Sequence, residues 1–234
     1  MDLNLIQKLS IFVLPVIFAI TLHEAAHGYV AKYFGDLTAY QAGRISLNPV
    51  RHIDLVGTLI VPGIILLTSS LFGGGFILFG WAKPVPVNFG RLRRPKQDML
   101  WVAAAGPLAN LAMALLWAMV MKIGLALHGN SLAEPMTLMG VAGVFINAVL
   151  MTLNLFPLPP LDGGRIAVSL LPNPYAYRFA RVEPYGMMIL LVLLFTGILG
   201  FFMWPLVEIT MSGAVALVGI RFEQFLPILT ALLK

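Results

Sequence analysis

The sequence predicts an all-α polytopic membrane protein, that is, a chain that crosses a bilayer several times as helices. Of its 234 residues, 59% are hydrophobic and only 11% are charged, and the mean hydropathy is +0.91. Soluble domains carry about 25% charged residues, and no hydrophilic block of this chain is long enough to form one. We therefore expect a single integral-membrane domain over residues 1–234.

The apolar runs predict about five to six transmembrane helices. Residues 55–80 are apolar but contain Gly73-Gly74-Gly75, so we expect them to enter the membrane and return as a hairpin or a re-entrant segment. The tail is amphipathic and is expected along the membrane surface. The spans are expected near residues 5–34, 99–123, 136–156, 185–203 and 205–220, and the tail covers 221–234.

The net charge of +5 comes from basic residues in short loops between apolar runs. This distribution predicts topology rather than nucleic-acid binding, because the cytoplasmic loops of membrane proteins are enriched in Lys and Arg. We therefore expect a multi-pass protein of the cell membrane, with the lipid bilayer as a partner and no nucleic acid. The cytoplasmic segments are expected at 35–54, 81–98, 157–184 and 221–234, and the connection at 124–135 is expected outside.

The strongest chemical signal is His23-Glu24-Ala25-Ala26-His27, which follows the first apolar run. On a helix, His23 and His27 project from one face, and H-E-x-x-H supplies two imidazoles to zinc and a carboxylate as base. The alternative is a chance pentapeptide. We favour zinc, because ionisable residues at bilayer depth are costly and are rarely kept without a partner or a function.

A catalytic zinc site needs a third protein ligand, and the chain contains no cysteine. Asp162 is the preferred candidate, because it follows a run of prolines and precedes Gly163 and Gly164. Such a segment ends a helix and turns sharply, and non-helical backbone at membrane depth must face protein or a wet cavity. The alternative is an ordinary turn in which Asp162 caps the next helix.

These motifs, together with Gly106-Pro107-Leu108-Ala109-Asn110 and Asn154, resemble the site-2 protease family of intramembrane zinc metalloproteases. The match is to the minimal form, without PDZ or CBS domains. It implies a catalytic core at about residues 5–170 and accessory helices at about 185–234. It also implies Zn2+ as the cofactor and roles for five residues: His23, His27 and Asp162 as ligands, Glu24 as the catalytic base, and Asn154 as a contact to substrate or oxyanion.

The resemblance implies hydrolysis of peptide bonds in or near the transmembrane segment of a single-span membrane protein. Residues 81–88 alternate like a strand but hold two prolines, and they resemble the β-like element near the active site of this family. Trp81, Val85 and Val87 are therefore predicted to hold unwound substrate by β-augmentation. The alternative for this stretch is an anchor at the lipid interface.

Other polar and small residues in the spans have structural interpretations. Asn110 and Asn147 are predicted to form hydrogen bonds between helices, and Asn154 has the same alternative to its catalytic role. Gly140-x-x-Gly143 is predicted to be a helix-packing face. A different class of function is a metal transporter or sensor without proteolytic activity, in which Glu24 would be a ligand or a relay.

Overall fold

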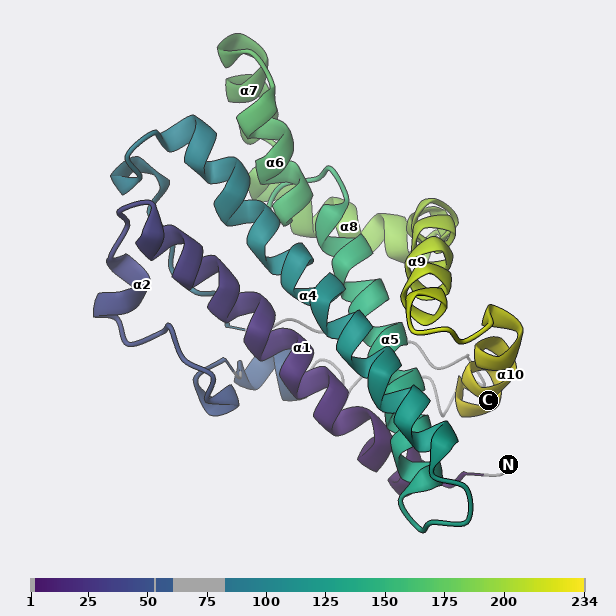
Figure 1. The fold of residues 1–234 in the computed structure, drawn as a ribbon. Coiled ribbons are helices and arrows are strands. Elements are labelled where there is room, and N and C mark those ends of the chain that lie inside the picture. Colours follow the sequence, from purple (N-terminus) through teal and green to yellow (C-terminus); the bar gives the residue numbers. More distant parts are fainter. Residues whose placement is uncertain (1–2, 53, 61–82, 234) are drawn as a thin grey trace.

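The computed structural model describes residues 3–52, 54–60 and 83–233, and every regular element in these ranges is a helix (Figure 1). Four helices are long and apolar enough to cross a membrane: α1 (Leu5–Tyr33), α4 (Pro95–Ala126), α5 (Ala133–Leu155) and α9 (Ile198–Leu217). Two shorter apolar helices are α8 (Glu183–Phe195) and α10 (Phe222–Leu233). The all-α membrane fold is confirmed, and the predicted re-entrant segment falls mostly outside the described residues, which include only its first turn, η2 (Leu55–Ile60).

Helix α1 begins with a capping box at Asn4. The Asn4 side chain accepts a hydrogen bond from the Gln7 backbone, and the Gln7 side chain accepts one from the Asn4 N–H. The helix has 29 residues, which at 1.5 Å per residue gives a length of about 44 Å. This exceeds the roughly 30 Å hydrocarbon core of a bilayer, so α1 is longer than a helix needs to be to cross that core.

Helices α4 and α5 form an antiparallel pair, and glycines allow their close approach. A Cβ on Gly140 would lie 2.5 Å from the Met121 backbone nitrogen, and a Cβ on Gly143 would overlap the indole ring of Trp117. The predicted packing face is therefore confirmed. Helices α1, α9 and α10 pack against this pair and complete the main buried core.

The predicted boundary between the last two spans, at residues 203–205, is wrong. Helix α9 passes through Pro205 without ending, and the break lies at Gly197, which has a φ of +76°. A glycine adopts this left-handed conformation without the penalty that a Cβ imposes, whereas neighbouring groups can compensate for a proline within a membrane helix.

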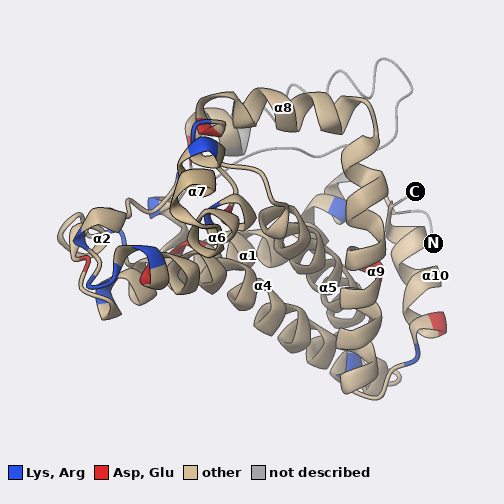
Figure 2. Ribbon diagram, turned by 90° about the horizontal axis from the view of Figure 1, so that it is seen from above, with Lys and Arg blue, Asp and Glu red and all other residues tan. Residues whose placement is uncertain are grey.

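The tail does not lie with the other segments that were predicted to be cytoplasmic. Figure 2 shows most of the charged residues gathered around α2 (Thr38–Gln41) and α7 (Asn173–Ala180), at one end of the long helices. Helix α10 lies at the other end, where Pro227 and Ile228 line a hollow together with His128 of the α4–α5 connection. The tail has only two basic residues, and its apolar face is buried against protein: Phe225, Leu229 and Leu232 belong to the main core.

Candidate metal centre

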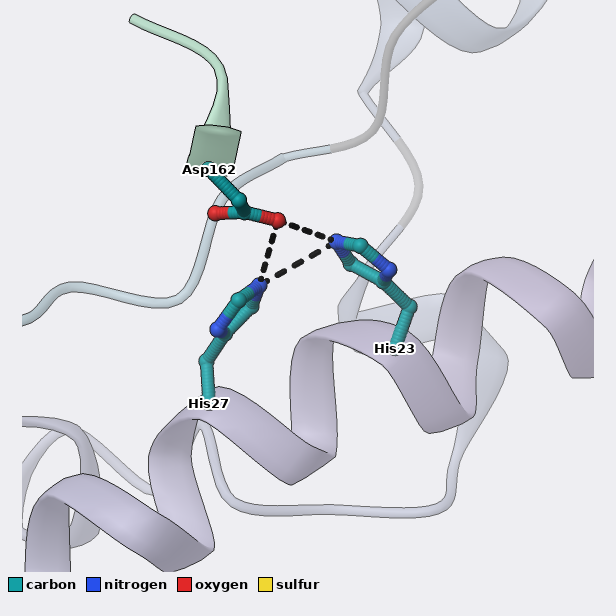
Figure 3. A group of neighbouring side chains, drawn as sticks. All are labelled: His23, His27 and Asp162. Carbon is teal, nitrogen blue, oxygen red and sulfur yellow. Dashed lines mark hydrogen bonds and ion pairs between the residues drawn. The ribbon is translucent and has the colours of Figure 1, made fainter. Parts of the chain in front are cut away.

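Helix α1 presents the two motif histidines toward α4, one turn apart, and both are buried. Asp162, the first residue of α6 (Asp162–Leu170), reaches them from a distant part of the chain (Figure 3). Its side chain caps no helix, because α6 has Leu161 at its N-cap and no side-chain capping bond. The structure therefore brings His23, His27 and Asp162 together, as the zinc hypothesis requires.

The three ligand atoms form a nearly equilateral triangle. Asp162 Oδ2 lies 3.2 Å from His23 Nε2 and 3.2 Å from His27 Nε2, and the two Nε2 atoms are 3.1 Å apart. Zinc–ligand bonds of about 2.0–2.1 Å in a tetrahedron place ligand atoms roughly 3.3 Å from one another. The observed triangle has the size that a tetrahedral zinc site requires.

The partners of the outer imidazole nitrogens determine where the ring protons lie. His23 Nδ1 is 2.6 Å from Asn110 Oδ1, and His27 Nδ1 is 2.7 Å from the Val102 carbonyl oxygen. Because both partners are acceptors, each neutral ring carries its proton on Nδ1 and points the lone pair of Nε2 at the centre.

Asp162 Oδ2 adds a third acceptor, and it is buried without a hydrogen-bond donor. Three acceptors at this spacing in an apolar surrounding repel one another unless a cation lies among them. Two imidazoles and one carboxylate are a donor set that zinc accepts in catalytic sites.

Gly106 of α4 keeps the space in front of the histidines open. A Cβ at this position would lie 2.6 Å from His23 Nε2 and closer still to His27 Nε2. Only a residue without a side chain leaves this cradle free for a metal ion. Gly106 and Asn110 are four residues apart and so share the face of α4 that meets α1, a spacing that could have identified both as residues of the site.

The loop that carries Asp162 turns back on itself, and glycines allow it. A Cβ on Gly163 would overlap the carbonyl of Leu155, and a Cβ on Gly164 would overlap the backbone of Pro159. The two glycines therefore permit a tight reversal between α5 and α6. This reversal places the carboxylate beside α1, which explains how a residue so far along the chain reaches the histidines.

Glu24 lies on α1 between the histidines in sequence but outside their triangle, whose ligand atoms all fall within 4.8 Å of one another. Its Oε2 accepts a hydrogen bond of 2.7 Å from the Val85 backbone N–H. This arrangement suits a base rather than a metal ligand. The contact brings the segment after residue 82 next to the metal centre, as its resemblance to an element near the active site implied, but the bond from the Val85 backbone to Glu24 was not anticipated.

The other predicted site residues are less directly connected to the triangle. The Asn154 amide donates to the Leu150 carbonyl of its own helix, and it makes no hydrogen bond to the ligands or Glu24 among the described residues. Trp81 lies outside the described residues. Residues 83–88 form no paired strand in the described part of the chain, and Val85 is buried while Val87 is half-buried. The predicted β-like element is therefore not confirmed, and the roles of Asn154, Val85 and Val87 stay predictions.

Asp36, just beyond α1, anchors this segment. Its carboxylate is buried and accepts hydrogen bonds from the backbone N–H groups of Thr38 and Asn88. Burial raises the pKa of Asp36, but a hydrogen bond from the Thr38 hydroxyl, the two backbone hydrogen bonds and the positive charge of Arg91 outweigh it and lower the pKa below its usual 3.8. The ionised carboxylate thus holds residue 88 against the end of α1, three residues from Val85.

Sequence comparison with known proteins places the chain in a family. The sequence profile described as Peptidase family M50 matches residues 123–197. YwhC of Bacillus subtilis (strain 168) is 35% identical to this protein, and the match covers 97% of this chain and 100% of YwhC. The chain belongs to peptidase family M50. The resemblance to site-2 proteases is thereby confirmed.

Two more distant relatives of this M50 peptidase also match over most of the chain. Rip2 of Mycolicibacterium smegmatis (strain ATCC 700084 / mc(2)155) is 30% identical over 86% of the chain and 74% of its own length. MJ0611 of Methanocaldococcus jannaschii (strain DSM 2661) is 25% identical over 71% of the chain and 72% of its own length. All three relatives are described by their names as candidate zinc metalloproteases, and no solved structure matches the chain. The chain is a zinc metalloprotease with helices that can span a membrane, and Zn2+ is its cofactor.

Proposed function

We propose that this M50 peptidase hydrolyses peptide bonds in or near the transmembrane segment of single-span membrane proteins, at a zinc ion held by His23, His27 and Asp162. The observation that carries this proposal is the convergence of three buried acceptors, two of them on the apolar span α1 and the third, Asp162, brought to it by α6. His27 precedes the end of α1 at Tyr33 by six residues, or about 9 Å along the helix axis. A site at that depth meets peptide bonds that are embedded in the bilayer or just emerging from it.

Each residue has a defined task in this proposal. Zinc bound by the triangle would supply an acidified water and an electrophile for the scissile carbonyl. Glu24 takes the proton from the attacking water and delivers it to the leaving amine. Asn154, once released from Leu150, donates its amide N–H to the oxyanion or to the substrate backbone.

Substrate must present an extended backbone, because the peptide bonds of an intact helix are hydrogen-bonded internally. We assign the holding of this unwound stretch to the segment that contains Trp81, Val85 and Val87, by backbone hydrogen bonds. The charged end of the helices is proposed to face the cytoplasm, since Lys and Arg are enriched there. The membrane is proposed to be the cell membrane.

The test is the Glu24→Gln variant, reconstituted in liposomes with a single-span reporter protein. Wild-type protein should cut the reporter within or beside its span. The variant should bind zinc with unchanged affinity and lose at least about a thousandfold in rate, the upper part of the range for general acid–base catalysis. Cutting by the variant at the normal rate would refute the mechanism.

The same liposomes separate a protease from a metal transporter. Liposomes that contain wild-type protein or the Glu24→Gln variant are loaded with a zinc-sensitive dye, and zinc is added outside. A protease leaves the dye signal at the level of protein-free liposomes. Zinc uptake that depends on Glu24, without cleavage of the reporter, would instead support the transporter alternative.

A further inference from the structure

A chain of buried amides leads away from the candidate metal centre through three helices. His23 of α1 contacts Asn110 of α4, and the Asn110 amide nitrogen lies 2.9 Å from Asn147 Oδ1 of α5. Both asparagines have no exposed surface. The Asn147 amide nitrogen in turn donates to the Gly143 carbonyl, 2.9 Å away on its own helix.

This chain of hydrogen bonds has one direction. The Gly143 carbonyl can only accept, so the Asn147 amide points its nitrogen there and its oxygen toward Asn110. That oxygen accepts a hydrogen bond from the Asn110 amide nitrogen, which also donates to the Ala19 carbonyl at 3.3 Å. The Asn110 oxygen is therefore left facing His23. His23 must then donate from Nδ1. Reversing either amide would oppose donor to donor and acceptor to acceptor inside the bundle.

Helix packing fixes the position of Asn147, where the chain of hydrogen bonds begins. The overlap that any side chain at Gly143 would make with Trp117 shows how closely α5 lies on α4 at this point. Asn147 follows one turn later on the same face of α5. The close α4–α5 contact therefore sets the position from which Asn147 reaches Asn110.

We propose that Asn147 is a positioning residue of the metal centre, which acts through Asn110 to hold His23 in the Nδ1–H form with Nε2 free for zinc. The proposal rests on His23 being a zinc ligand. It adds a residue on α5 that touches neither metal nor substrate, and it gives the contact between α4 and α5 control over the affinity for zinc.

The other histidine provides an internal contrast. His27 donates to the backbone carbonyl of Val102, which no side-chain substitution removes. The orientation of His23, in contrast, depends on two side chains. The proposal therefore predicts that the asparagine variants weaken zinc binding through His23 alone.

The experiment measures zinc affinity by chelator competition in detergent for Asn110→Leu, Asn147→Leu and the double variant. Removing an outer partner of a metal-bound histidine lowers affinity by about 10–100-fold, and we expect this loss for Asn110→Leu. Asn147→Leu should lose about tenfold or less. The double variant should lose no more than Asn110→Leu alone, because both changes interrupt one chain. Asn110→Asp should stay close to wild type, since either ionisation state presents an oxygen to His23.

A matched control is Thr210→Val, which removes another buried polar group, a hydroxyl that donates to the Leu206 carbonyl of its own helix, α9. It should leave zinc affinity unchanged. The second readout is the ¹⁵N NMR spectrum of the histidine rings in zinc-free protein. In wild type, His23 should carry its proton on Nδ1, and in Asn147→Leu part of the population should carry it on Nε2. If Asn147→Leu does not fold, Asn147→Ala gives the same comparison.

Three results are decisive. A folded Asn147 variant with wild-type zinc affinity and an unchanged His23 spectrum overturns the proposal. Additive losses in the double variant also overturn it, because Asn147 would then act only as a contact between helices. A wild-type protein that binds no zinc, or binds it as well after His23→Ala, contradicts instead the proposed function on which the inference rests.

Discussion

The backbone N–H of Val85 donates to Glu24 Oε2 across 2.7 Å, so the carboxylate proposed as the base is held by a main-chain group. Residue 85 stands between Pro84 and Pro86, neither of which has an N–H to donate. Val85 is thus the one residue of this tripeptide that can bind the carboxylate. Arg44 donates to the Lys83 carbonyl and Asp36 accepts from Asn88, so both ends of the segment are tied down.

Replacing Val85 by proline removes that donor. Hydrogen bonds to charged groups contribute about 1.5–3 kcal/mol, which corresponds to roughly 10–100-fold in rate. We expect Val85→Pro to lower the cleavage rate of a membrane reporter by this factor with unchanged zinc content. Val85→Ala keeps the N–H and serves as the control. Equal rates for the two variants would show that the contact does not support catalysis.

Adding one methyl group at Gly106 should eliminate metal binding. The Cβ of alanine would occupy the space in front of both Nε2 atoms. We expect Gly106→Ala to lower zinc affinity by more than about a hundredfold, beyond the range for loss of an outer contact, as measured by metal content after dialysis. Gly213→Ala is the matched control, because a Cβ at this helical glycine meets nothing within 4 Å. Normal zinc content in Gly106→Ala would contradict the assigned site.

Asp162→Asn tests the third ligand. The amide keeps the size of the side chain but loses the charge that offsets the metal, so zinc affinity should fall by more than about a hundredfold. Asp98→Asn is the control, since Asp98 is equally buried but accepts from the Arg94 backbone at the start of α4. If both variants keep zinc, a different group completes the site.

Asp36 gives a prediction for pH. Its pKa is lower in the folded protein than its usual 3.8, so the stabilisation it provides is fully present above about pH 3.8 and is lost as pH falls through the folded value. Asp36→Asn should therefore lower the melting temperature most at neutral pH, and the difference from wild type should shrink below about pH 3.8. Glu223→Gln, exposed in the first turn of α10, controls for the loss of one negative charge. A difference that is independent of pH would contradict the assignment.

Much of this protein could be predicted because the relevant signals are local. Apolar runs define spans by length, and three of them became helices close to the expected bounds, namely α1, α4 and α5. The one-turn spacing of His23 and His27 places both rings on one face of any helix. The proline-rich segment before Asp162 ends α5 whatever path the following loop takes.

Other features depend on contacts between segments that no local pattern encodes. Helix α9 continues through Pro205 because its surroundings tolerate the break, and α10 turns toward the α4–α5 connection because its apolar face finds protein there. The contact of Val85 with Glu24 joins residues 61 positions apart through a backbone group that has no side-chain signature.

The sequence by itself determined a helical membrane protein with a zinc-binding pair of histidines, because hydrophobic length and helical periodicity act within one segment. Tertiary structure alone decided between the ligand and the capping role of Asp162. It also decided that Asn110 sets the proton on His23 and that the main chain at Val85 holds Glu24. These depend on how closely α1, α4 and α5 approach, and glycines without side chains control that approach.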